Sequence, residues 1–127
     1  MRLLLDTHVF LWYLTGAKAL SVDLRKTIQH PGNAVFLSPV SIWEALVKYR
    51  LGKLPLPASP EIYLPDQRRR HGIETLPLDE PSVARLAGLP DLHRDPFDRM
   101  LVCQALEHEL TLATVDLAVR AYPVPSC

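Results

Sequence analysis

Short apolar runs that end at or near an acidic residue recur along this chain, and they constrain its fold more than any other feature. Four acidic residues stand at such places or open a helical pattern, and we call them the acidic quartet: Asp6, Glu44, Asp98 and Asp116. Asp6 closes the run Arg2-Leu3-Leu4-Leu5, and Asp116 follows the run from Leu110 to Thr114. Buried strands that alternate with helical patterns favour a parallel sheet covered by helices on both faces.

The pattern of apolar residues and turn signals predicts where the elements lie. Strands are expected at residues 2–5, 34–37, 73–76 and 110–114. Helices are expected at residues 7–15, 21–29, 39–50, part of 60–71, 79–87, 96–109 and 116–121. Pro65 makes the helix within 60–71 the least regular, and residues 123–125 are candidates for an edge extension. We therefore predict one three-layer α/β/α domain over residues 1–127, with a mainly parallel sheet of about four to five strands.

The acidic quartet is expected to gather at one edge of this sheet. The carboxyl ends of parallel strands meet at a common crevice, which is where open α/β sheets bind ligands. Four carboxylates that converge there repel one another unless a cation lies between them. Ligands that are all oxygen favour Mg²⁺ or Mn²⁺, and a hard metal in an acidic crevice suggests hydrolysis of phosphodiester bonds.

Each acid also has a purely structural explanation. Asp6 and Asp116 can cap the helices that follow them, and Ser41 with Glu44 has the S-x-x-E spacing of a capping box. Asp98 lies in a first helical turn, where the helix dipole favours a carboxylate. Helix starts and the ligand-binding edge coincide in such folds, so spacing alone leaves both explanations open.

Charge and cysteine content narrow the function classes. The chain carries 14 basic and 14 acidic side chains, unlike a general nucleic-acid coat, so an RNA site must be local or metal-mediated. Neutrality also makes self-association plausible. Cys103 and Cys127 lack a metal-type spacing, no apolar run approaches the length of a membrane span, and only three leucines precede Asp6. We expect no membrane attachment, no signal peptide and a cytoplasmic location.

Four segments carry a resemblance to a known family: Leu5-Asp6-Thr7-His8, Ser41-Ile42-Trp43-Glu44, His93 to Arg99 (HRDPFDR) and Thr114-Val115-Asp116. Together they resemble the PIN-domain ribonucleases, in particular the VapC-type toxins of bacterial toxin–antitoxin pairs. The resemblance runs along essentially the whole chain, and the D-T-H, S-x-W-E and D-P-F-D-R motifs are together specific to a VapC subgroup.

The resemblance implies both an activity and a set of partners. It implies a Mg²⁺- or Mn²⁺-dependent endoribonuclease in which the acidic quartet binds the metal, Thr114 supports the site with its hydroxyl, and cleavage leaves a 3′-hydroxyl and a 5′-phosphate. It also implies a homodimer held inactive by a cognate antitoxin. Because Mg²⁺ keeps several waters, Asp6 and Asp98 are expected to bind directly, and Glu44 and Asp116 directly or through water. The alternative is a non-catalytic PIN-like module whose acidic rim binds a cation or a basic peptide.

The sequence leaves more than one possible role for several other polar and charged residues. Asp95 is favoured as the N-cap before Pro96 over a fifth metal ligand. His93 is either a phosphate contact or a solvated loop residue, and Arg99 either contacts phosphate or orients Asp98. Arg68-Arg69-Arg70-His71 is the densest basic run and the best local candidate for contact with an RNA backbone.

Further basic and aromatic residues complete the candidates. Lys48, Arg50 and Lys53 form a second basic group with the same choice between a solvated helix face and RNA contact. Trp12 and Trp43 lie within apolar helical patterns, which favours a place in the core or in an interface over base stacking.

Overall fold

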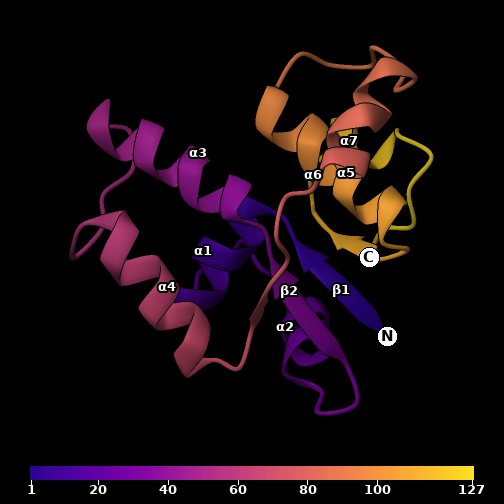
Figure 1. The fold of residues 1–127 in the computed structure, drawn as a ribbon. Helices are drawn as coiled ribbons and strands as arrows, with labels where there is room; N and C mark the ends of the chain where they lie inside the picture. Colours follow the sequence, from indigo (N-terminus) through magenta and orange to yellow (C-terminus); the bar gives the residue numbers. More distant parts are fainter.

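The fold is a four-stranded parallel sheet between two layers of helices (Figure 1). It is described by a computed structural model that covers residues 1–127. The strands are β1 (Arg2–Leu5), β2 (Ala34–Leu37), β3 (Glu74–Thr75) and β4 (Thr111–Ala113). The helices are α1 (Thr7–Thr15), α2 (Val22–Gln29), α3 (Pro39–Arg50), α4 (Pro60–Arg70), α5 (Glu80–Ala84), α6 (Pro96–Glu107) and α7 (Leu117–Arg120), and a 3₁₀ turn follows α5 at Arg85–Ala87.

The strands lie in the order β3-β2-β1-β4, and every neighbouring pair is parallel. The predicted fold class is therefore confirmed. The C-terminal segment runs beside β4, where Leu112 bridges Ser126 and the Cys127 amide donates to the Leu112 carbonyl. This contact confirms an edge extension, displaced by a residue or more from the expected 123–125.

Side chains of β1 alternate between the two faces of the sheet and so divide the core into two parts. Leu3 and Leu5 pack with buried residues of α1, α2 and α4, and Leu4 packs with buried residues of α6 and the C-terminal segment. All three leucines have no exposed surface. Because parallel strands are covered on both faces, the apolar run of β1 is continuous rather than alternating.

Local chemistry explains where most helices begin and end. The Ser38 hydroxyl accepts a hydrogen bond from the Val40 amide, and Pro39 stands at the first helical position of α3. Helix α1 ends at Gly16, whose φ of 68° is a left-handed conformation that glycine adopts without steric cost. The structure thus assigns the cap of α3 to Ser38, and the capping box suggested by Ser41 and Glu44 is wrong.

Several element boundaries differ from the prediction, and the helix expected at 116–121 is shortened to Leu117–Arg120. The expected strand 73–76 is shortened to Glu74–Thr75, and 110–114 is shortened to Thr111–Ala113. The expected helix 79–87 is divided into α5 and a 3₁₀ turn, and the helix expected at 96–109 ends at Glu107. Helix α4 passes through Pro65 from Pro60 to Arg70, because Leu64 is anchored in the core with 1% of its surface exposed. Packing of an apolar anchor outweighs the one hydrogen bond that a proline removes.

Candidate active site

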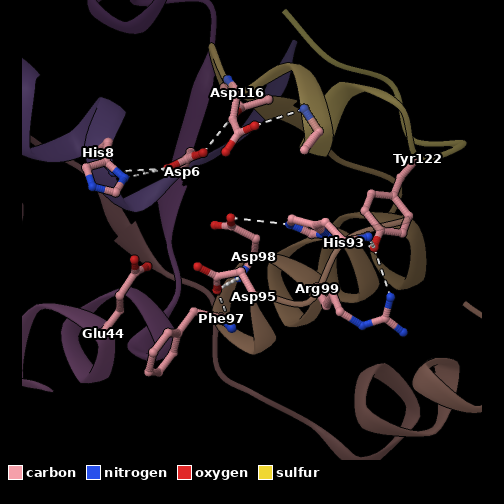
Figure 2. A network of polar contacts seen from close by, with 12 residues as sticks. Asp6, His8, Glu44, His93, Asp95, Phe97, Asp98, Arg99, Asp116 and Tyr122 are labelled. Atoms are coloured by element: carbon pink, nitrogen blue, oxygen red, sulfur yellow. Dashed lines mark hydrogen bonds and ion pairs between the residues drawn. The ribbon is translucent and has the colours of Figure 1, made fainter. Parts of the chain in front are cut away.

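The acidic quartet lies at the carboxyl edge of the sheet, with two acids at helix caps and two inside helices (Figure 2). Asp6 is the N-cap of α1 directly after β1, and Asp116 is the N-cap of α7 after β4. Glu44 lies in the second turn of α3, and Asp98 lies in the first turn of α6. The capping explanations for Asp6 and Asp116 are therefore confirmed, and the same helix starts lie at the edge of the sheet that carries all four acids.

Thr114 connects two of these acids. Its hydroxyl donates to Asp6 Oδ2 over 2.7 Å and accepts from the Asp116 amide over 3.1 Å. Thr114 is fully buried, and the other Asp6 oxygen accepts from the His8 amide over 2.9 Å. One buried hydroxyl at the end of β4 therefore fixes both the Asp6 carboxylate and the backbone that presents Asp116.

Glu44 is the most deeply buried member of the quartet, with 1% of its surface exposed. One of its carboxylate oxygens pairs with Lys48 one helical turn later, and the other, Oε1, is buried with no hydrogen-bond partner. A buried carboxylate oxygen without a partner is unfavourable, so this atom is the one most in need of an additional positive ligand. On the same helix, buried Ser41 accepts a hydrogen bond from the Thr7 hydroxyl over 2.8 Å and ties α3 to α1.

Asp98 faces the other acids, and its environment opposes ionisation. Burial, together with the negative charges of Asp6, Asp95, Glu44 and Asp116, raises the pKa of Asp98 to about 8. Burial also raises the pKa of Asp6, against the lowering effect of its hydrogen bond from Thr114. Burial is the largest cause of both shifts, and the charges of the other three acids add to the shift of Asp98, as expected for carboxylates at one edge of a sheet.

An aromatic contact holds the two helices that carry Glu44 and Asp98. The rings of Trp43 on α3 and Phe97 on α6 meet edge to face with centroids 4.8 Å apart. Trp43 nevertheless remains 58% exposed, which excludes a place in the core and leaves the predicted interface role open. Each aromatic residue stands next to an acid in the sequence, so this contact between α3 and α6 lies beside Glu44 and Asp98.

The residues around Asp98 have structural partners of their own. Asp95 Oδ1 accepts from the amides of Phe97 and Asp98, which confirms Asp95 as the N-cap of α6. Arg99 donates to the Pro90 carbonyl and to the Tyr122 hydroxyl, and its side chain is 13% exposed. A direct phosphate contact by Arg99 therefore finds no support in this conformation. His93 lies between Tyr122 and Asp98, 3.4 Å from Asp98 Oδ2, and is not a solvated loop residue.

The expected tight set of ligands is not found, because no three of the His, Cys, Asp and Glu side chains form a group that could hold a metal ion. Each acid instead turns to a local donor, which is Thr114 for Asp6, Lys48 for Glu44, His93 for Asp98 and the Ala118 amide for Asp116. Mutual repulsion explains this arrangement. The chemistry of the donors still fits Mg²⁺ or Mn²⁺, since all are carboxylates, one buried oxygen lacks a partner, and Mg²⁺ commonly takes only one or two carboxylates plus waters.

The two groups of basic residues lie at different positions relative to the acidic quartet. Arg68 donates to the Ile73 carbonyl just before β3, which places the run Arg68 to Arg70 at the amino edge of the parallel sheet, opposite the acids (Figure 1). Lys48 pairs with Glu44 at the site itself, and Arg50 lines a cavity between α3 and α4. Lys48, and not the run Arg68 to Arg70, is thus the basic group that contacts the acidic quartet.

Two contacts escaped the sequence reasoning. The pairing of Glu44 with Lys48 was detectable, because oppositely charged residues four positions apart on a helix face one another. Tyr122 had no such signal, since it lies 29 residues from His93 and nothing in the sequence brings the two together. Only the fold of the C-terminal segment against α6 does so.

A family model for the PIN domain matches residues 3–124, which is nearly the whole chain. The chain belongs to the PIN-domain family. The resemblance found in the four motifs is therefore confirmed at the level of the family, and the predicted α/β architecture agrees with it.

Two curated relatives are ribonucleases of Mycobacterium tuberculosis. Ribonuclease VapC16 is 40% identical over 70 residues, which is 54% of this chain and 50% of that protein. The chain thus matches about half the length of this relative. Ribonuclease VapC22 is 27% identical over 123 residues, 96% of this chain and 92% of that protein. These matches support the VapC-type subgroup that the motifs predicted.

Solved structures agree with the fold. VapBC2 from Rickettsia felis, bound to a DNA fragment from its promoter, superposes with a TM-score of 0.73 at 15% identity and covers 100% of this chain and 98% of that one. VapBC from Salmonella typhimurium, also bound to DNA, gives a TM-score of 0.66 at 16% identity, covering 100% of this chain and 97% of that one. At such identities the likeness establishes the fold.

Proposed function

We propose that this protein is an endoribonuclease that hydrolyses RNA phosphodiester bonds with Mg²⁺ or Mn²⁺ and acts as the toxin of a toxin–antitoxin pair. The observation that supports the proposal is the position of all four acids of the quartet along the carboxyl edge of a PIN domain, where burial and the other carboxylates raise the pKa of Asp98. Relatives named as VapC ribonucleases support the choice of RNA and of the toxin role.

Asp6 and Asp98 would hold the ion directly, with Glu44 and Asp116 binding directly or through water. When bound, such an ion lowers the pKa of a coordinated water and polarises the phosphate. Thr114 keeps the Asp6 carboxylate aimed at the edge, and Glu44 offers its unpartnered Oε1. Asp98 must release its proton before it can act as a ligand, so metal binding and proton release are coupled at this residue.

Cleavage of a labelled single-stranded RNA tests the activity. The purified protein should cleave in the presence of Mg²⁺ or Mn²⁺ and stop when EDTA is added, and Asp6→Asn should be inactive. Asp23→Asn is the matched control, because Asp23 lies in the first turn of α2 and its side chain contacts no residue of the site. Cleavage that persists in Asp6→Asn would point to a contaminant or to another site. Metal binding without cleavage of any RNA would favour the alternative, a non-catalytic cation-binding module.

The predicted partners are a second copy of the chain and an antitoxin. The exposed apolar residues Trp43, Val47 and Ile62 belong to α3 and α4, and a cavity of about 520 Å³ lies between these helices. Exposed apolar surface of this kind marks an interaction site. The structural neighbours described as VapBC complexes support an antitoxin as one occupant.

Two experiments address these partners. The chain should sediment as a dimer, and co-expression with the gene of its antitoxin should relieve the growth arrest that the chain causes alone. A monomer whose expression leaves growth unchanged would contradict both partner assignments.

None of the helices has both the length and the apolar character needed to cross a bilayer. A cytoplasmic location is part of the same proposal.

A further inference from the structure

A chain of hydrogen bonds leads away from the acidic edge into the core. Asp98 Oδ2 lies 3.4 Å from His93 Nε2, and His93 Nδ1 lies 2.8 Å from the Tyr122 hydroxyl (Figure 2). The same hydroxyl accepts from Arg99 Nη1 over 2.9 Å and from the His93 amide over 3.2 Å. Tyr122 is 3% exposed and packs among the buried residues of the α6 face. This network joins the first turn of α6, the loop before it and the C-terminal segment.

From this network we infer that Tyr122 is a positioning residue, which fixes the proton of His93 on Nε2 and so aims an N–H donor at Asp98. Only the predicted effect on activity rests on the proposed RNA hydrolysis. The hydrogen-bond arrangement is a property of the folded chain by itself and can be tested without RNA.

The position of each proton follows from the donors and acceptors present. A tyrosine hydroxyl has one proton to donate and two lone pairs with which to accept. Arg99 and the His93 amide occupy the accepting side of Tyr122, because both are N–H donors. The hydroxyl proton is then directed to His93 Nδ1, which must accept it and therefore carries no hydrogen. The single imidazole proton remains on Nε2, on the side of Asp98.

This donor matters because Asp98 has few other constraints. His93 is the one side chain that hydrogen-bonds the Asp98 carboxyl, whereas Asp6 has both Thr114 and the His8 amide. The Nε2–Oδ2 distance of 3.4 Å is long, so a small movement of the imidazole is enough to lose the bond. Groups that orient a metal-binding side chain typically change metal affinity or activity by about 10–100-fold when they are removed.

Tyr122 cannot act on RNA itself. Its hydroxyl is buried and all three of its hydrogen-bonding positions are used within the protein. Arg99 also stacks over the tyrosine ring, with its guanidinium carbon 5.9 Å from the centroid, and is held by Pro90 and Asp91. The effect of Tyr122 on catalysis must therefore pass through His93.

Tyr122→Phe tests the inference, because it removes one oxygen and leaves the ring in the core. Long-range ¹H–¹⁵N spectra of the metal-free protein should show the His93 proton on Nε2 in the wild type and a mixture of both ring forms in the variant. Mg²⁺ affinity and kcat should both fall by about 10-fold or more, while KM for RNA changes little. Tyr63→Phe is the matched control, since Tyr63 is half-buried and its hydroxyl makes no hydrogen bond.

A second pair of variants separates positioning from packing. The side-chain amide of Gln at position 93 can donate to Asp98 without help from Tyr122, so His93→Gln should retain more activity than His93→Ala. Tyr122→Phe should then cost little when added to His93→Gln, and the double-mutant cycle measures this coupling. The comparison of His93→Gln with His93→Ala also tests the inference if Tyr122→Phe folds poorly.

The outcomes are distinct. A wild-type His93 proton on Nδ1, or His93 signals unchanged by Tyr122→Phe, overturns the inference whether or not RNA is cleaved. Full activity and Mg²⁺ affinity in Tyr122→Phe overturn it as well. Absence of cleavage by the wild type counts against the proposed function, and the spectra of His93 still decide the hydrogen-bond arrangement.

Discussion

The two sides of the acidic edge hold their carboxyl groups in different ways. On the α3 side, Glu44 is paired with Lys48 of the same helix, and its second oxygen has no partner. On the α6 side, Asp98 is held by His93, which is in turn held by Tyr122 from the C-terminal segment. One side relies on a local charge and the other on a network between distant segments. Removal of a partner should therefore perturb metal-free stability on the first side and ligand orientation on the second.

The largest expected effect comes from neutralising either acid. Asp98→Asn and Glu44→Gln should each reduce the rate of RNA cleavage by on the order of 10²–10³-fold, if electrostatic stabilisation carries the reaction. The two variants should differ in the free energy of unfolding measured without metal above pH 8. Asp98→Asn removes a charge that repels its neighbours, whereas Glu44→Gln leaves the Lys48 charge unpaired.

Single-turnover rates and urea unfolding of the same samples measure both quantities. Asn at position 98 should raise the midpoint of unfolding at pH 9, and Gln at position 44 should lower it. Equal shifts in the same direction would mean that the two sides of the edge are not electrostatically different.

A smaller effect is expected when Lys48 is replaced by Met. Glu44 then keeps a buried charge without a partner, and because Lys48 is 32% exposed the cost should be about 1–2 kcal/mol, between that of surface and buried pairs. Mg²⁺ should stabilise this variant more than the wild type, because a competing cation has been removed.

Arg70→Met is the matched control for Lys48→Met. Arg70 and Asp66 form an exposed pair with the same four-residue spacing, and its loss should cost under about 0.5 kcal/mol. Urea unfolding with and without Mg²⁺ gives the comparison. If Mg²⁺ stabilises Lys48→Met no more than the wild type, Glu44 does not take part in metal binding.

The stability of the metal-free protein should also depend on pH. The pKa of Asp98 is raised from 3.8 to about 8, so the folded chain binds this proton more tightly than the unfolded chain does. The resulting stability is fully present below pH 3.8, declines as the pH rises toward 8, and is absent above it. Between pH 5 and 8 this term should lower Tm by about 10 °C or more, since each pH unit is worth about 1.4 kcal/mol.

Thermal unfolding of Asp98→Asn isolates this term. The variant should lack it, whereas Glu44→Gln should retain most of it, because burial is the largest cause of the Asp98 shift. Mg²⁺ affinity of the wild type should rise over the same pH range, since the ion competes with the proton. A wild-type Tm profile that matches that of Asp98→Asn would contradict the raised pKa.

The comparison also separates what the sequence predicts from what it does not. The strand ends that carry Asp6 and Asp116 follow from apolar runs, and their convergence follows from parallel topology. The Glu44–Lys48 pair follows from helical spacing. The place of Tyr122 does not, because it depends on how a short C-terminal segment packs against α6 beside β4.

The sequence also predicts only part of the charge state of the site. The sequence predicts that the four carboxylates repel one another, but not which carboxyl group has the most strongly raised pKa. Asp98 is affected most because it is buried and because the negative charges of Asp6 and Asp95, followed by those of Glu44 and Asp116, add to the effect of burial. At Asp6, the hydrogen bond from Thr114 opposes the rise of the pKa.

The central claim is that the acidic quartet forms one metal site, and paramagnetic broadening by Mn²⁺ tests it most directly. At low Mn²⁺, the amide signals around residues 6, 44, 98 and 116 should broaden together, recover with EDTA, and need far more Mn²⁺ in Asp6→Asn. The Asp79–His108 pair, with 2.7 Å between its atoms, is an internal reference elsewhere on the chain. Broadening centred on Asp79, or broadening unchanged in Asp6→Asn, would contradict the claim.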